Sequence, residues 1–159
     1  MVITSRKLES NDWHYFTKWW RDKELIKLTS GDHTPLTDED IKQRVAEMAM
    51  EDNSHHWLIR AEDVIVGHIN LNKIDGNSAE LQIVIGEKEY WGKGIGKEAI
   101  SQTIKKANNL GFKKIIAEVR PENSRAFGLY KKMGFHKIDN KKYPDNPNLP
   151  EVIVMIKEL

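Results

Sequence analysis

The segment Trp91–Lys97 carries three glycines at alternate positions, between an apolar run and an amphipathic run. Gly92, Gly94 and Gly96 would let backbone N–H groups approach a ligand closely, which larger side chains would prevent. The amphipathic run predicts a helix that begins at Gly94, and a helix N-terminus supplies aligned N–H donors and a partial positive charge. These properties suit a phosphate group. A glycine-rich turn without a ligand is the alternative.

Two known phosphate-binding motifs can be compared with this segment. The Walker A loop would need a glycine where Lys97 stands, so that motif is excluded. The dinucleotide fingerprint G-x-G-x-x-G/A is satisfied by Gly94–Ala99, and Glu118 follows at about the place of a ribose-binding acid. Against this motif stand the long connection over residues 86–93 and the short remainder of the chain. A dinucleotide-binding module therefore stays open as an alternative.

The same segment resembles the acetyl-CoA-dependent N-acetyltransferases of the GNAT superfamily. Their signature is Gln/Arg-x-x-Gly-x-Gly/Ala at the start of a helix, and Trp91–Gly96 matches it except that Trp91 replaces the Gln/Arg. The pattern Tyr90–Gly94 is similar to the branch that contains the ribosomal-protein acetyltransferases. Further matches are Glu118–Asn123 and Ala126–Phe135. The resemblance is specific from about residue 79 to 138.

The resemblance implies a site for acetyl-CoA. A strand would line the pantetheine arm with its backbone, the glycine loop would hold the pyrophosphate, and an asparagine would hydrogen-bond near the pantetheine amide. These three places correspond to Ile83, Val84 and Ile85; to Trp91, Gly92, Lys93, Gly94, Ile95, Gly96 and Lys97; and to Asn123. Residues 92–142 carry 13 Lys and Arg against 4 Asp and Glu, which fits a ligand with several phosphate charges. For Asn123, capping of a helix that begins at Ser124 is an equally good interpretation.

The resemblance also implies two catalytic side chains. Tyr130 would donate a proton to the leaving thiolate, although its spacing from Phe127 and Met133 also suits a core residue. Glu80, directly or through water, would remove the proton of an ammonium group, although an outward, solvated carboxylate is an equal alternative. We expect the free amine to attack acetyl-CoA directly, with the oxyanion held by a strand N–H near Val84 or Ile85. The acceptor would be a primary amine of a small molecule or of a protein N-terminus. A CoA-binding module without turnover is the second alternative.

Other candidate side chains favour structural roles. His55, His56 and His68 could imitate a metal site, but adjacent strand residues point to opposite faces, so no metal is expected. The tryptophans of the first helix are expected in the core, although this helix is where GNAT enzymes build the acceptor pocket. These tryptophans are Trp13, Trp19 and Trp20.

Hydrophobic periodicity and turn residues predict the elements that hold these groups. Strands are predicted over residues 2–8, 56–61, 64–74, 79–85, 114–119, 135–138 and 152–156. Helices are predicted from Trp13 with an Asn11-Asp12 cap, over 25–28, after the capping box of Thr37 and Asp40, over 94–110 and over 124–133. Strand–helix–strand over residues 79–120 predicts a parallel pair with a right-handed crossover. We therefore expect an α+β fold: a mixed, mostly antiparallel sheet with a central parallel pair and helices on both faces.

Composition limits the remaining function classes. The 159 residues suit one domain, 1–159, and the absence of cysteine excludes disulfides and a cysteine nucleophile. A net charge of +1 argues against a general nucleic-acid partner. No stretch is apolar and long enough to span a membrane, and the first residues do not form a signal peptide. We expect a soluble, cytoplasmic protein whose partners are acetyl-CoA and an amine; a homodimer stays open.

Overall fold

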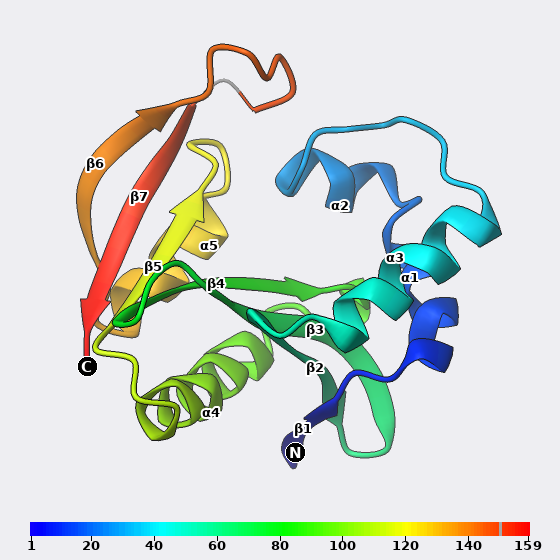
Figure 1. The fold of residues 1–159 in the computed structure, drawn as a ribbon, viewed down its shortest axis with the longest axis horizontal. Helices are drawn as coiled ribbons and strands as arrows, with labels where there is room; N and C mark the ends of the chain where they lie inside the picture. The colour runs from blue at the N-terminus through cyan, green and yellow to red at the C-terminus, as the bar shows by residue number, and fades with distance from the viewer. Residues whose placement is uncertain (150) are drawn as a thin grey trace.

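A computed structural model describes residues 1–149 and 151–159, which form one seven-stranded sheet in the order β1-β2-β3-β4-β5-β7-β6 (Figure 1). The strands are β1 (Ile3–Lys7), β2 (Ser54–Ala61), β3 (Val64–Lys73), β4 (Ser78–Ile85), β5 (Lys114–Val119), β6 (His136–Lys142) and β7 (Glu151–Glu158). The helices are α1 (Trp13–Trp19), α2 (Lys23–Leu28), α3 (Asp38–Met50), α4 (Ile95–Asn109) and α5 (Ser124–Lys132), with short 3-10 turns at Ser10–Asp12 and Lys88–Tyr90.

The sheet is mixed, as the sequence predicts. β4 and β5 pair in parallel, with α4 as the crossover between them, and the other neighbouring strands pair antiparallel. The parallel register covers Ser78–Glu80 of β4 against Lys114–Ile116 of β5 and then stops. The α+β architecture with a central parallel pair is therefore confirmed.

Helices cover both faces of the sheet. On one face, Ala99 and Ile100 of α4 pack with Ile69 and Leu81 of the central strands, and α5 joins this core. On the other face, α1, α2 and α3 pack around Leu58 of β2, with their buried side chains Phe16, Trp19, Leu25, Ile41 and Val45. In Figure 1 α4 lies below the sheet, and α1, α2 and α3 lie together on the right.

Two local predictions can be compared in detail. The capping box at the start of α3 is confirmed: the Thr37 hydroxyl accepts a hydrogen bond from the Asp40 N–H, and the Asp40 carboxylate accepts one from the Thr37 N–H. The predicted side-chain cap of α1 is wrong. The Asp12 carboxylate instead pairs with the Arg6 guanidinium at 2.8 Å and accepts from the Glu9 N–H, because a buried carboxylate gains more from a cation than from one more amide.

The C-terminal hairpin also differs from the prediction. β6 runs to Lys142, whereas the sequence predicted a strand that ends at Ile138 and a turn-rich stretch from Asn140. A register shift between Lys137 and Asp139 lets these polar residues continue to pair with β7.

Among the described residues, no helix has both the length and the apolar character that crossing a membrane would require.

Candidate active site

The candidate site begins where β4 and β5 separate. Their pairing ends at Glu80 and Ile116, while β4 continues to Ile85. Among the residues that the structure describes, one edge of β4 therefore has no strand partner beyond this point. The N–H of Gly86 donates to the Val66 carbonyl on β3. Because successive residues of a strand point their amides to opposite edges, Ile83 and Ile85 direct their amides away from β3. The amide of Val84 points toward β3.

This alternation corrects the prediction that all three residues offer backbone groups to a pantetheine arm. The Val84 amide belongs to the β3–β4 ladder, so only Ile83 and Ile85 present theirs on the side of β5. The Ile85 carbonyl already accepts a hydrogen bond from the Trp91 indole N–H at 2.8 Å. Val84 takes part through its side chain instead, which lines the cavity described below.

The glycine loop follows β4 and leads into α4. Gly92 and Gly94 have φ angles of +74° and +79°, so both need the left-handed region that other residues rarely adopt. A Cβ at either position would meet no atom within 4 Å, so the space beside the loop is open. At Gly96, by contrast, a Cβ would come within 3.0 Å of Leu129, so this glycine permits the close packing of α4 against α5.

The side chains of the loop have separate tasks. Ile95 is 1% exposed and belongs to the core, so only its backbone is available to a ligand. Lys93 and Lys97 are exposed, and the Lys93 ammonium lies 5.4 Å from the centre of the Tyr90 ring. Trp91 stacks under the Arg125 guanidinium at 4.2 Å. Where the GNAT signature has Gln or Arg, this chain therefore uses an indole that fixes the loop to β4.

A cavity of about 800 Å³ lies next to the separated strands. Its apolar wall comes from Phe16 and Trp19 of α1 and from Trp20, which follows this helix. Trp19 and Trp20 therefore serve both the core and the cavity. Its polar floor comes from alternate residues of β3 and β4. The floor residues are His68, Asn70, Asn72, Glu80 and Gln82.

Tyr130 projects from α5 toward this cavity. The residue is 4% exposed, and its ring packs edge-to-face on Phe135 at 5.1 Å. No hydrogen bond joins its hydroxyl to another described residue, although Tyr130 lines the cavity. Burial raises the pKa of Tyr130 strongly, and the negative charge of Glu80 adds to the shift. The hydroxyl is thus a protonated donor without an acceptor among the described residues.

Glu80 lies at the point where the two strands part. Burial raises the pKa of its carboxyl group, and the charge of Glu118 on β5 adds to the effect. A network of amide side chains lies beside it: Gln82 donates to Glu80 at 3.3 Å, and Asn70 and Asn72 each donate to the Gln82 carbonyl at 3.3 Å. A carboxyl group with a raised pKa in a cavity is suited to exchange a proton with a bound ligand.

The side chain of Asn123 forms hydrogen bonds within the protein. Its carbonyl oxygen accepts a hydrogen bond from the Ala126 N–H at 3.1 Å, which caps α5. Its amide group donates to the Leu28 carbonyl at 3.5 Å. The capping interpretation is confirmed. Asn123 therefore links α5 to α2.

The histidines form a stacked pair. His56 on β2 and His68 on β3 lie with ring centres 5.2 Å apart and ring nitrogens 3.0 Å apart. The other nitrogen of His56 lies 3.3 Å from the Glu51 carboxylate. Burial, together with the charge of His56, lowers the pKa of His68 to about 3. Within residues 1–149 and 151–159, no group of three or more His, Cys, Asp or Glu side chains is placed to hold a metal ion.

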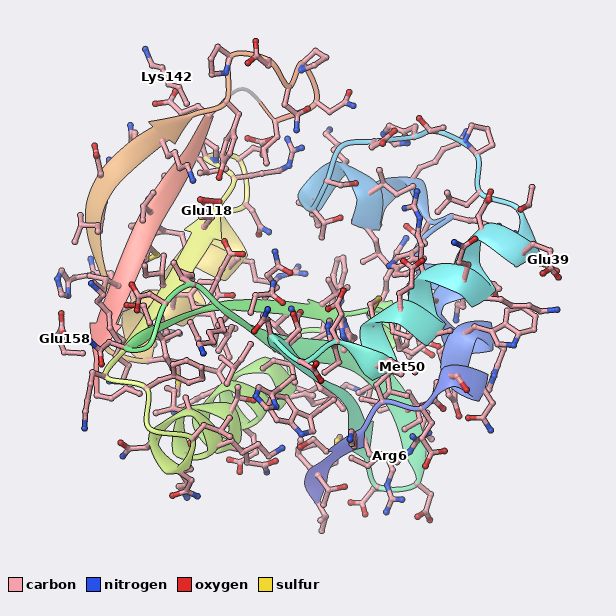
Figure 2. The ribbon with its side chains drawn as sticks, viewed as in Figure 1. Arg6, Glu39, Met50, Glu118, Lys142 and Glu158 are labelled. Carbon is pink, nitrogen blue, oxygen red and sulfur yellow. The ribbon has the colours of Figure 1, made fainter. Side chains whose placement is uncertain are left out.

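Glu118, labelled in Figure 2 beside the end of β5, is bound by side chains of the protein rather than left open for a ribose. The Tyr143 hydroxyl donates to its carboxylate at 2.6 Å, and the Lys141 ammonium lies 3.3 Å away. The mixed sheet also differs from the doubly wound parallel sheet that the dinucleotide fingerprint requires. The dinucleotide alternative is therefore not supported.

Comparisons with known proteins identify the family of the chain. The model of the acetyltransferase (GNAT) domain family matches residues 3–136. The chain belongs to this GNAT acetyltransferase family. An uncharacterized N-acetyltransferase p20 from Bacillus licheniformis is 28% identical, over 85% of this chain and 79% of that protein. An uncharacterized protein of Methanocaldococcus jannaschii is 29% identical over 94% of this chain, which spans only 31% of the length of that relative.

A solved structure shares the fold of this GNAT acetyltransferase. Spermidine N-acetyltransferase from Vibrio cholerae, in complex with CoA and spermine, superposes with a TM-score of 0.85 at 21% identity. The match covers 98% of this chain and 95% of that one. At this identity the likeness establishes the fold.

The structure adds residues to the site of this GNAT acetyltransferase that the sequence did not single out. Gln82 donates to Glu80, Asn70 and Asn72 donate to Gln82, and Arg120 lines the same cavity. Asn70, Asn72 and Gln82 could have been found from the sequence, because polar residues alternate along β3 and β4 on the same face as Glu80. For Arg120 there was no such signal, because its partners come from distant segments.

Proposed function

We propose that this protein transfers an acetyl group from acetyl-CoA to a primary amine of a small molecule or a protein N-terminus, by direct attack. The observation that carries the proposal is the placement of Tyr130. Its buried side chain lines the cavity with no acceptor for its hydroxyl among the described residues, and its pKa responds to the charge of Glu80. Tyr130 and Glu80, which line the same cavity, would then serve as the proton donor and the proton acceptor.

The cosubstrate would bind along β4. The N–H groups at the start of α4 and the open space beside Gly92 and Gly94 would receive the pyrophosphate. The free amides of Ile83 and Ile85 would pair with the pantetheine arm, as a further strand would. The thioester would then lie near Glu80 and Tyr130. Asn123 would contribute mainly by holding the start of α5.

The proton movements follow from this placement. Glu80, directly or through one water, would take the proton from the ammonium form of the acceptor, so that the free amine can attack the thioester carbon. An N–H of Ile83 or Ile85 would hold the developing oxyanion. Tyr130 would donate its hydrogen bond, and finally its proton, to the departing CoA thiolate. With a raised pKa, the tyrosine hydroxyl would act mainly as a hydrogen-bond donor and transfer its proton late.

The acceptor would enter over α1 and α2. The cavity offers aromatic surface from α1 and amide and carboxyl groups from β3 and β4, which suits an amine with an apolar or extended body. Spermidine N-acetyltransferase, which shares this fold, was solved with spermine, and this supports the choice of small amines as candidate acceptors. Ribosomal N-termini, amino sugars and amino acids stay in the test set.

The test is the release of free CoA thiol from acetyl-CoA in the presence of an amine panel, with mass spectrometry of the acetylated amine. CoA should also raise the unfolding free energy, by about 2.7 kcal/mol at a hundredfold excess over its dissociation constant. Protection by CoA without turnover on any amine would favour the CoA-binding module. Protection by NAD(H) and none by CoA would overturn the proposed cosubstrate.

A further inference from the structure

Arg120 follows the last residue of β5 and extends between two loops that are distant in the sequence. Its side chain is 9% exposed. Its Nε donates to the Thr29 carbonyl at the end of α2, and its Nη2 donates to the Asn148 carbonyl in the β6–β7 loop. Nη1 lies 3.3 Å from the carboxylate of the exposed Glu122. One guanidinium therefore connects both loops to the end of β5.

Gly31 shows how closely this junction is packed. Its φ angle is +70°, and a Cβ there would overlap Nη2 of Arg120 and lie 2.6 Å from the Asn148 carbonyl oxygen. The loop after α2 can therefore lie against the guanidinium only because residue 31 has no side chain. The Asn123 amide, which reaches the Leu28 carbonyl, adds a second link from the same side.

These segments border the cavity. Leu28, Thr29 and Ser30 line it from the end of α2, Leu149 lines it from the β6–β7 loop, and Arg120 lies between them. In Figure 1, α2 and the β6–β7 loop both lie in the upper part of the molecule. The distance between the two loops therefore sets the width of this end of the cavity.

We propose that Arg120 is a positioning residue that fixes this width and thereby determines which amines the site accepts. The proposal rests on the proposed function, because it assumes that the cavity receives the acceptor. A guanidinium is planar and presents its N–H donors in a rigid fork, so two carbonyls bound to it are held at a fixed separation. A lysine ammonium keeps the charge but cannot impose this geometry.

The kinetic experiment compares Arg120→Lys and Gly31→Ala with Glu122→Gln. The first two variants disturb the junction, and the control removes only the surface partner of the same guanidinium. With the best amine of the panel, we expect the KM for the amine to rise at least tenfold in Arg120→Lys and Gly31→Ala. The KM for acetyl-CoA should stay within about twofold in all three variants, and discrimination between short and long amines should decrease in the first two.

Two results would overturn the proposal. One is an unchanged KM for the amine in Arg120→Lys. The other is an equal loss of affinity for both substrates, which indicates general destabilisation.

Amide hydrogen exchange on the free protein supplies a readout that needs no turnover. Exchange should increase together in residues 29–37 and 143–149 of Arg120→Lys and in neither segment of Glu122→Gln. Increased exchange in one loop alone would contradict the coupling even if wild type acetylates no amine, an outcome that would separately remove the proposed function.

Discussion

The two sides of the cavity are built in different ways. The proposed cosubstrate side comes from one continuous stretch, β4 through α5, and its main groups are backbone amides, two glycines in the left-handed region and Tyr130. The proposed acceptor side comes from α1, α2, the end of α3 and the β6–β7 loop, which are joined by side chains such as Arg120. A backbone-built site depends on the identity of few side chains, whereas a side-chain-built wall can change its selectivity residue by residue. The variants below act on one of these sides or on the boundary between them.

Removal of the Tyr130 hydroxyl should have the largest effect. Tyr130→Phe keeps the ring against Phe135 and removes only the proton donor, so kcat should fall by about 10²–10⁴ while acetyl-CoA affinity barely changes. Tyr15→Phe, which removes a hydroxyl from α1, is the matched control and should leave kcat unchanged. Steady-state kinetics with the best amine gives both values. A kcat of Tyr130→Phe within a few-fold of wild type would remove this hydroxyl from the mechanism.

Glu80→Gln tests the proton acceptor between the two sides. We expect kcat/KM to fall by about 10², because the isosteric amide cannot accept a proton. In wild type, kcat/KM should rise with pH as Glu80 ionises, with a midpoint above the ordinary glutamate pKa of about 4.3, since burial and Glu118 raise that pKa. A pH–rate profile measures this limb. If the limb persists unchanged in Glu80→Gln, another group is the base.

The role of the glycine loop can be tested by comparing the two glycines that flank α4. Gly94 and Gly111 flank α4 and have φ angles of +79° and +89°, and a Cβ at either position would meet no atom within 4 Å. Alanine should therefore cost about the same stability at both positions, roughly 1 kcal/mol. Only Gly94→Ala should weaken CoA binding, by about tenfold, because only that methyl group enters the phosphate approach. Calorimetric titration with CoA measures the affinity of both variants. Equal CoA affinities of Gly94→Ala and Gly111→Ala would assign Gly94 a purely conformational role.

The histidine pair should make the acceptor side sensitive to acid. An unfolded histidine has a pKa of about 6.5, and that of His68 is lowered to about 3, so the unfolded chain binds the extra proton between these values. Stability should therefore decrease as pH falls below about 6.5, by up to about 1.4 kcal/mol per pH unit. Urea unfolding at pH 7.5 and 5.5 measures the difference. His68→Gln should show a smaller difference, and an equal one would place the acid sensitivity elsewhere.

Local patterns in the sequence predicted most of the fold. The capping box of Thr37 and Asp40, the amphipathic run of α4 and the strand–helix–strand order each depend on residues close together in the chain. The length of β6 was missed because its residues are polar and exposed. Its pairing depends on β7, which lies beyond a long turn.

The candidate site divides in the same way. The glycine loop could be recognised because its spacing directly reflects its backbone conformation. The role of Asn123 as a cap was one of two predicted roles, and only the hydrogen bonds to Ala126 and Leu28 show how its side chain is used. The Arg120 contacts to Thr29 and Asn148 could not be predicted, since no local pattern links segments so far apart.

The central claim is that the amine attacks acetyl-CoA directly while both are bound on their separate sides of the cavity. Initial rates of CoA release, measured as the concentrations of acetyl-CoA and the best amine are both varied, test it most directly. Direct attack predicts intersecting double-reciprocal lines and no acetylated protein when acetyl-CoA is supplied alone. Parallel lines together with an acetylated form of the protein would contradict it.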